Sequence, residues 1–211
     1  MTIEVIDSWG DDLRVANVAR VSFDNWKNIF EDKDAKLIHY LADHEHTSPF
    51  RHVGVTIRCE APVFLRTQLM KHQVGLSWNE VSRRYVNSEP EFFSPATWRA
   101  KPEGSIKQGS GKDVDEQEDW YLRYDEHINN SRWLYNYMLN SGIAPEQARI
   151  VLPQSMLTSW IWTGSLLAFF HVWRLRSDGH AQEEAQDFAR ELDTIMSKLF
   201  PVSWLALKEA T

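Results

Sequence analysis

The sequence predicts an α+β protein that is mostly helical around a small, mainly antiparallel sheet. Apolar residues recur at three- and four-residue spacing in several long segments, as in amphipathic helices, while two short segments alternate apolar with polar residues, as strands do. The chain has 211 residues, of which 43% are hydrophobic. That is enough for one sizeable core, so we expect a single domain over residues 1–211.

The first elements expected are a strand and two helices. The alternating stretch 2–7 predicts an edge strand. Asp11 or Asp12 can cap the helix that follows. A second helix is expected at 34–44, and it ends ahead of Pro49 because proline disfavours helical geometry in the residue before it.

A second strand is expected at 53–61, where Val53, Val55, Ile57 and Cys59 fall on one face. Cys59 shares that face with three apolar residues, so we interpret it as a core side chain and not as a nucleophile. Because it is the only cysteine, an internal disulfide and a thiolate metal cluster are both excluded.

A helix is expected to begin at Pro62, which suits a first helical turn, and to continue to residue 72. Gln68, Lys71 and His72 are three and four residues apart, which places them on one face of that helix. Gly75 is expected to release the chain into an irregular loop.

The second half is expected to be helical after one interruption. Residues 86–115 hold three prolines and several glycines and serines, and we expect a flexible insertion at about 100–118. Helices are then expected at 116–140, from Pro145, at 163–176 and at 180–200.

The charge balance limits the possible partners. The formal net charge is −7 and the sequence pI is about 5.6, which excludes a broad cationic surface for nucleic acid and favours a small phosphorylated ligand. No apolar run approaches the roughly 18 residues that span a bilayer, and the N-terminus lacks a leader pattern. We expect a cytoplasmic protein without a membrane partner.

Neither a metal site nor a glycine-rich phosphate loop is expected. His44, His46 and His52 come closest to a set of metal ligands. However, His44 and His46 are two positions apart in the sequence, so they cannot lie on the same face of a helix. We therefore expect no metal. The chain also lacks the P-loop and dinucleotide-binding patterns, so a nucleotide would have to be held by side chains.

Arginines supply that possibility. Five of them lie in or beside apolar segments: Arg83, Arg84, Arg149, Arg174 and Arg176. Burying a guanidinium group in an apolar environment costs free energy unless the group pairs with an anion. Each could pair with a nearby acid, but five together predict at least one anion site.

Several blocks carry a family resemblance. They are ARVSFD (19–24), HEHTSPFRH (44–52), APVFLRTQLMKH (61–72), NEVSRRY (79–85), QARIVLP (147–153) and LRSDGHAQ (175–182). In this order, the blocks resemble the flavin-dependent thymidylate synthases of the ThyX type. The resemblance covers most of the chain outside the insertion and implies a single ThyX-like catalytic domain.

The chain departs from the family's signature, which is Arg-His-Arg, seven residues, then Ser. Here Lys71, His72 and Gln73 stand for the first three residues, and eight residues separate Gln73 from Ser82. Lys71 keeps a cation but lacks the planar two-pronged donor, and Gln73 removes a charge. Where many members carry Asn, Arg and Asn against the flavin, this chain has Ser165, Leu167 and His171.

The resemblance implies methylation of dUMP to dTMP without a cysteine nucleophile. FAD in its reduced form would supply the hydride, methylenetetrahydrofolate the one-carbon unit, and NADPH would regenerate the flavin. Arg176 would be catalytic because it stabilises negative charge on the uracil ring. The family is homotetrameric, with active sites shared between subunits.

The resemblance also assigns binding residues. For dUMP they are Gln68, Lys71, Glu80, Ser82, Arg83, Arg84, Arg149 and Arg176. For FAD they are Ser22, His46, Ser48, Lys71, His72, Gln73, Glu80, Ser165 and His171.

Two other functions stay open at this point. The altered segment from Lys71 to Gln73 motivates a flavin- and folate-dependent hydroxymethylase acting on a pyrimidine nucleotide. Gln73 and Leu167 motivate a non-catalytic dUMP-binding relative that has lost its flavin.

Overall fold

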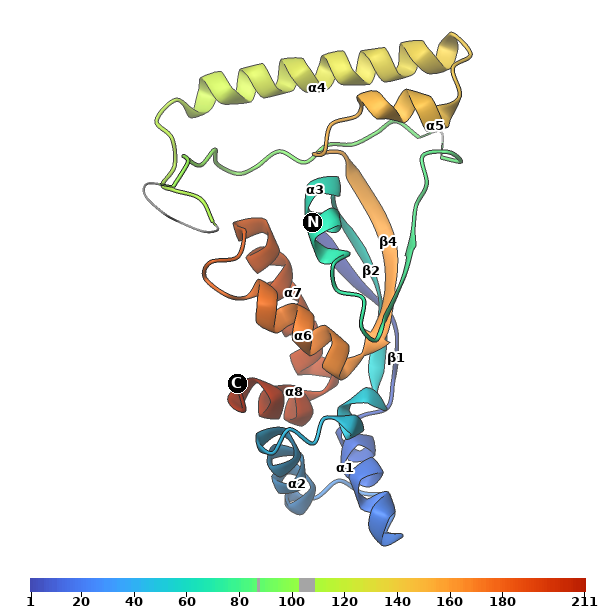
Figure 1. Ribbon diagram of the computed structural model, residues 1–211, viewed down its shortest axis with the longest axis vertical. Helices are drawn as coiled ribbons and strands as arrows, with labels where there is room; N and C mark the ends of the chain where they lie inside the picture. The colour runs from blue at the N-terminus through green and yellow to red at the C-terminus, as the bar shows by residue number, and fades with distance from the viewer. Residues whose placement is uncertain (87, 103–108) are drawn as a thin grey trace. The chain divides into compact units, whose positions relative to one another are not determined.

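The fold is built on a four-stranded antiparallel sheet with the strand order β1-β2-β4-β3, of which Figure 1 labels β1, β2 and β4. The strands are β1 (Thr2–Trp9), β2 (Gly54–Pro62), β3 (Leu76–Glu80) and β4 (Leu157–Ser165). This computed structural model describes residues 1–86, 88–102 and 109–211. The α+β class with a small antiparallel sheet is therefore confirmed.

Contacts within the chain divide it into two compact units. Unit 1 comprises Met1, Glu60–Lys71 and Glu80–Trp160, and unit 2 comprises Thr2–Cys59, His72–Asn79 and Ile161–Thr211. The chain passes from one unit to the other within β2, β3 and β4. The single catalytic domain expected over 1–211 stays a prediction.

Unit 2 holds most of the apolar core. Its α-helices are α1 (Asp12–Arg20), α2 (Asp32–Asp43), α6 (Leu166–Arg176), α7 (Glu183–Leu199) and α8 (Pro201–Glu209), with short 3-10 helices at Val21–Phe23 and Ser48–Arg51. Helix α2 packs against α8, and α6 packs against α7. Large aromatic side chains fill this unit, and Trp162, Phe188 and Trp204 are almost completely buried. Their flat rings supply much of its buried apolar area.

Unit 1 is organised around one long helix. Its helices are α3 (Val63–Leu69), α4 (Gln117–Asn140) and α5 (Pro145–Ala148), the last continued by a 3-10 turn at Arg149–Val151. Figure 1 shows α5 running beside the end of α4, and both α5 and its 3-10 turn contact α4. Gly142 follows α4 with a φ of +84°, a conformation that glycine adopts easily.

The N-terminal elements confirm the expected pattern. Strand β1 lies at one edge of the sheet. Asp11 caps α1, with its carboxylate accepting a hydrogen bond from the backbone N–H of Arg14 at 2.8 Å.

The alternation predicted for β2 is also confirmed. Val53, Val55, Ile57 and Cys59 are all completely buried. Burial, followed by the nearby negative charge of Glu191, raises the pKa of the Cys59 thiol. Cys59 is thus a core residue, as the pattern indicated.

Three of the predicted assignments are wrong, and strand β4 up to residue 162 and helix α8 were not predicted at all. Helix α3 ends at Leu69, so Lys71 and His72 lie beyond it and do not share a helical face with Gln68. Residues 76–80 form β3 instead of an irregular loop, and 163–165 belong to β4 instead of the next helix. Both strands obtain their hydrogen-bond partners from segments distant in sequence, and local spacing does not reveal such partners.

The predicted flexible insertion at about 100–118 is only partly described. Residues 103–108 lie outside the described residues. On either side, the backbone N–H of Ala100 donates to Lys112 O and that of Gly111 donates to Ala100 O, both at 2.8 Å. Helix α4 already begins at Gln117, so the described ends of this segment carry regular hydrogen bonds.

The described residues form neither a membrane-spanning helix nor a metal-binding cluster. None of the helices described is both long enough and apolar enough to cross a membrane. Within the same residues, no group of three or more His, Cys, Asp or Glu side chains is arranged to hold a metal ion.

Candidate functional site

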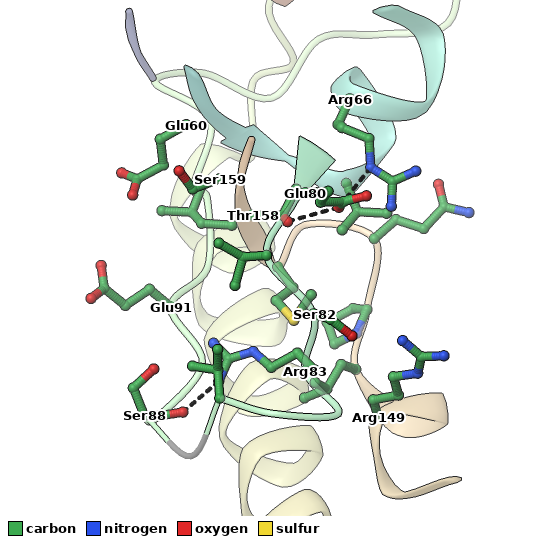
Figure 2. A pocket seen from close by; sticks show the side chains of 18 of the residues that line it. Glu60, Arg66, Glu80, Ser82, Arg83, Ser88, Glu91, Arg149, Thr158 and Ser159 are labelled. Carbon is green, nitrogen blue, oxygen red and sulfur yellow. Dashed lines mark hydrogen bonds and ion pairs between the residues drawn. The ribbon is translucent and has the colours of Figure 1, made fainter. Parts of the chain in front are cut away.

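A cavity of about 460 Å³ lies in unit 1 (Figure 2). Four of the residues assigned to dUMP line it: Glu80, Ser82, Arg83 and Arg149. Glu80 is the last residue of β3, Ser82 and Arg83 follow that strand, and Arg149 lies just after α5. Its volume is within the usual range for small-ligand sites.

One end of the cavity, the carboxylate end, is formed by Glu80 with Arg66 and Thr158 (Figure 2). The hydroxyl of Thr158 donates to Glu80 Oε1 at 2.8 Å. Arg66 Nε forms an ion pair with the same oxygen at 3.0 Å. Strand β4 positions Thr158, and helix α3 positions Arg66.

The other end, the arginine end, holds Arg83 and Arg149 (Figure 2). Arg83 donates from one terminal nitrogen to the backbone carbonyl of Ser88. Arg149 Nε donates to the carbonyl of Glu146 at 3.3 Å. Each of these contacts engages one guanidinium nitrogen, and an arginine has further N–H donors for a ligand.

The two ends differ in what they can bind. Guanidinium groups form strong charge-assisted hydrogen bonds with phosphate oxygens. A carboxylate at the opposite end can only accept, so it suits N–H or O–H donors. Glu60, Glu89 and Glu91 also line the cavity, which therefore offers donors for a phosphate at the arginine end and several acceptors for N–H or O–H groups of the same ligand.

The remaining residues assigned to dUMP do not line this cavity. Gln68 and Lys71 belong to unit 1 and lie in and just beyond α3. Arg84 also belongs to unit 1, where its Nε donates to Ser82 Oγ at 3.2 Å and its guanidinium lies over the ring of Tyr85. Arg176 is in unit 2.

In unit 2, His72 and Arg176 contact each other directly. Arg176 Nε donates to His72 Nε2 at 3.0 Å. The backbone carbonyl of His72 accepts from the indole N–H of Trp78 at 3.3 Å, and Trp78 packs on buried Trp162 with ring centroids 4.1 Å apart. The contact at the end of α6 is thus connected to the aromatic core.

Burial and charge keep His72 neutral. Burial, followed by the positive charge of Arg176 and then by His171, lowers the pKa of His72 to about 4. The pKa of His171 is lowered for similar reasons, by burial and then by Arg174 and Arg51. Neutral His72 can accept the hydrogen bond from Arg176, which a protonated ring could not do at Nε2.

The residues assigned to FAD that lie in unit 2 are mostly neutral and polar. Ser22, His46, Ser48 and Gln73 are exposed, and His171 is half-buried. Ser165 is half-buried and caps α6 by accepting from the N–H of Ala168. Hydroxyl, imidazole and amide groups match the carbonyl and N–H groups of an isoalloxazine ring. Their chemistry fits a flavin.

The assigned residues divide between the two units in a regular way. Apart from Arg176, every residue assigned to dUMP belongs to unit 1. Apart from Lys71 and Glu80, every residue assigned to FAD belongs to unit 2. The residues assigned to dUMP are therefore mostly in unit 1, and those assigned to FAD are mostly in unit 2.

Arg66 and Thr158 were not identified from the sequence. Thr158 lies on β4, which was not predicted, although its alternation of buried and half-buried residues is regular. Arg66 is a charged residue in the otherwise apolar start of α3. A charge in such a position indicates a partner of opposite charge and could have pointed to this site.

Comparisons with known proteins identify the family. Residues 4–202 match the family described as "Thymidylate synthase complementing protein". The flavin-dependent thymidylate synthase of Thermus thermophilus is 34% identical over 98% of this chain and 75% of its own length, and that of Thermosipho africanus is 36% identical over 94% and 87%.

Solved structures agree with this. The UMP/dUMP methylase PolB from Streptomyces cacaoi, bound with 5-Br dUMP, has a TM-score of 0.88 and 30% identity, covering 99% of this chain and 94% of PolB. A second PolB structure, bound with 5-Br UMP, has the same TM-score. The chain thus belongs to the thymidylate synthase complementing protein family, which includes the flavin-dependent thymidylate synthases.

Proposed function

We propose that the chain is a flavin-dependent thymidylate synthase that converts dUMP to dTMP by reductive methylation. Methylenetetrahydrofolate is the one-carbon donor, and NADPH is the reductant that regenerates the flavin. The observation that carries the proposal is the cavity with a carboxylate end and an arginine end, in a chain of this family.

Nucleotide binding follows from the chemistry of the cavity. Arg83 and Arg149 bind the phosphate of dUMP, with Arg84, Lys71 and Gln68 as further contacts in the same unit. Glu80 accepts from a donor on the nucleotide at the opposite end. Ser82 Oγ already accepts from Arg84 and has a ligand role, not a nucleophilic one.

Arg176 acts on the uracil ring. Its guanidinium stabilises negative charge that develops on the ring, which makes C5 more nucleophilic. The hydrogen bond to neutral His72 fixes the direction of the guanidinium before the nucleotide binds. Such preorganisation avoids reorganisation during the reaction.

The reaction proceeds without an enzyme thiolate. Cys59 is completely buried, and its raised pKa keeps the thiol protonated at neutral pH. Activation of C5 therefore depends on the charge of Arg176.

A flavin would be held by the polar side chains of unit 2 that fit it. These are Ser22, His46, Ser48, His72, Gln73, Ser165 and His171. When bound, FAD supplies the hydride for the reaction. His72 and His171, which burial and neighbouring cations keep neutral, offer it hydrogen bonds without adding charge.

We also infer a homotetramer with shared active sites. Large apolar side chains are exposed on two segments: Trp120, Leu122, Trp133 and Tyr137 on α4, and Val21, Phe23, Trp26 and Ile29 around the first 3-10 helix. Several large exposed apolar side chains on one segment are typical of interfaces. Ser22 lies within the second segment, beside two of them.

Release of tritium from dUMP labelled at C5 tests the proposed function. Purified protein given FAD, methylenetetrahydrofolate and NADPH should release the label and form dTMP. Arg176→Gln should lower the rate by roughly 100-fold, as for loss of a charge-stabilising donor. Arg123→Gln, which removes an exposed arginine of α4, is the matched control and should leave it unchanged. Absence of release from the wild-type protein would overturn the proposal.

A second candidate substrate is UMP, because the related PolB was crystallised with both 5-Br dUMP and 5-Br UMP. Parallel assays with UMP and dUMP decide between them. The mass of the product also separates methylation from hydroxymethylation, since a hydroxymethyl product carries one additional oxygen. Tight dUMP binding without flavin uptake would instead indicate a non-catalytic relative.

A further inference from the structure

Arg66 and Thr158 hold the same oxygen of Glu80. Thr158 Oγ1 lies 2.8 Å and Arg66 Nε 3.0 Å from Glu80 Oε1. The three residues come from β4, α3 and β3, and all three line the cavity (Figure 2). A carboxylate gripped from two elements has little freedom to rotate.

Arg66 is itself anchored within its helix. One terminal nitrogen of its guanidinium lies 3.0 Å from the sulfur of Met70, the residue that follows the end of α3. The side chains of Arg66 and Glu80 are 22% and 28% exposed. Because the pair is mostly withdrawn from water, solvent screens it less than it screens a surface ion pair.

The contacts leave a defined acceptor. Since both go to Oε1, Oε2 has no hydrogen bond from the residues that the structure describes. Arg66 also balances the negative charge of Glu80, which would otherwise oppose the entry of an anionic nucleotide into the same cavity.

We propose that Arg66 and Thr158 are positioning residues that hold Glu80 so that Oε2 accepts a hydrogen bond from bound uridylate. The donor is an N–H of the base or a hydroxyl of the sugar, because the phosphate at the other end offers acceptors. This inference rests on the proposed function.

Arg66 could instead contact the phosphate directly, and the two roles predict different results. An arginine that acts through Glu80 matters for a nucleoside without phosphate, and it matters little once Glu80 is removed. An arginine that binds phosphate shows the opposite behaviour in both respects.

Binding of dUMP and of deoxyuridine, measured by isothermal titration calorimetry on the flavin-loaded protein, tests this role. Arg66→Gln should weaken binding of both ligands about tenfold, because it removes the ion pair that holds Glu80 in place. Arg66→Lys should restore part of the affinity, and Thr158→Val should weaken binding severalfold. The control Arg123→Gln should change neither.

The double variant completes the cycle. In a Glu80→Gln background, Arg66→Gln should weaken the affinity for dUMP and for deoxyuridine less than twofold. The reason is that Arg66 acts only through Glu80, so its effect disappears with Glu80. Equal losses in both backgrounds, or a loss confined to dUMP, would overturn the positioning role. A wild-type protein that binds no dUMP would refute the proposed function instead. Melting temperatures identify any variant that fails to fold.

Discussion

At the scale of single residues, His72 is kept uncharged beside a cation. Burial and Arg176 lower its pKa to about 4 from the ordinary value of 6.5. The folded protein therefore binds this proton less readily than the unfolded chain does. By linkage, the stability that neutral His72 provides is complete above pH 6.5 and is lost as the pH falls from 6.5 towards 4.

His72→Gln should reduce this loss, because glutamine stays neutral and can still accept from Arg176. Between pH 7 and pH 5, the wild-type protein should lose about 1 kcal/mol more unfolding free energy than the variant. That figure is below the full linkage value because the ring is partly exposed. Urea unfolding at the two pH values measures it. The control His127→Gln, on the exposed face of α4, should behave as the wild type does.

Arg66 and Thr158 are site residues that local sequence patterns did not predict. Glu80, Ser82, Arg83 and Arg149, which the family resemblance assigned to dUMP, line one cavity, and their binding role stays a prediction. Arg66 can be recognised as a site residue only in the folded structure, where α3 and β3 bring its Nε to 3.0 Å from Glu80 Oε1. Such long-range contacts depend on the tertiary fold and leave no local period.

At the scale of elements, α8 is fixed at its start by a residue far away in sequence. The carboxylate of Asp12 accepts hydrogen bonds from the backbone N–H groups of Val202 at 3.0 Å and Ser203 at 2.9 Å. The first N–H groups of a helix have no partner within the helix, so this buried carboxylate caps α8.

Asp12→Ala should lower the unfolding free energy by about 2 kcal/mol, since it removes a cap and leaves two donors unpaired. Asp12→Asn keeps one acceptor and should cost about half as much. Chemical denaturation measures both changes. The exposed Asp7→Ala in β1 serves as the control, and a similar loss there would contradict the capping role.

Gly75 determines how the chain enters β3. Its φ is +74°, and a Cβ there would lie 3.2 Å from the Cβ of Ala168. Gly142 has a similar φ of +84°, but a Cβ there would meet nothing within 4 Å. The two glycines share the backbone requirement and differ only in the available space.

Gly142→Ala should therefore lower the unfolding free energy by about 1 kcal/mol, from backbone strain alone. Gly75→Ala should cost about 1 kcal/mol more, because Ala168 must also move. Thermal unfolding of both variants gives the comparison. Equal costs would show that the contact with Ala168 is not significant.

The elements differ in how well the sequence predicted them. The alternation of β2 was clear because its buried face is entirely apolar. In β4 the buried positions are Thr158, Trp160, Trp162 and Gly164, and the apolar run that follows made 163–176 resemble one helix. Strand β3 has only five residues, too few for a reliable period. The end of α3 at Leu69 has neither glycine nor proline to mark it.

At the scale of the whole molecule, the inferred tetramer should depend on α4. Trp133 and Tyr137 stack on each other with an angle of 7° between their rings, yet they are 64% and 58% exposed. A pair of exposed aromatic rings side by side is typical of a surface that another chain covers.

Trp133→Glu should shift the protein towards smaller species, because a charge buried at an interface is strongly destabilising. Light scattering coupled to size-exclusion chromatography should find four 24.7 kDa chains for the wild type and fewer for the variant. Glu118→Gln, in the first turn of the same helix, is the control. A wild-type mass of one chain would refute the tetramer.

The burial of Cys59 has a practical consequence for experiments on this protein. The natural chain has a single thiol, and it lies in the core of unit 2, so maleimide dyes and spin labels cannot reach it in the folded state. A cysteine introduced at an exposed position such as Lys36 on α2 would then be labelled selectively, without first replacing the native residue. Distances and subunit exchange could be measured on an otherwise unaltered protein.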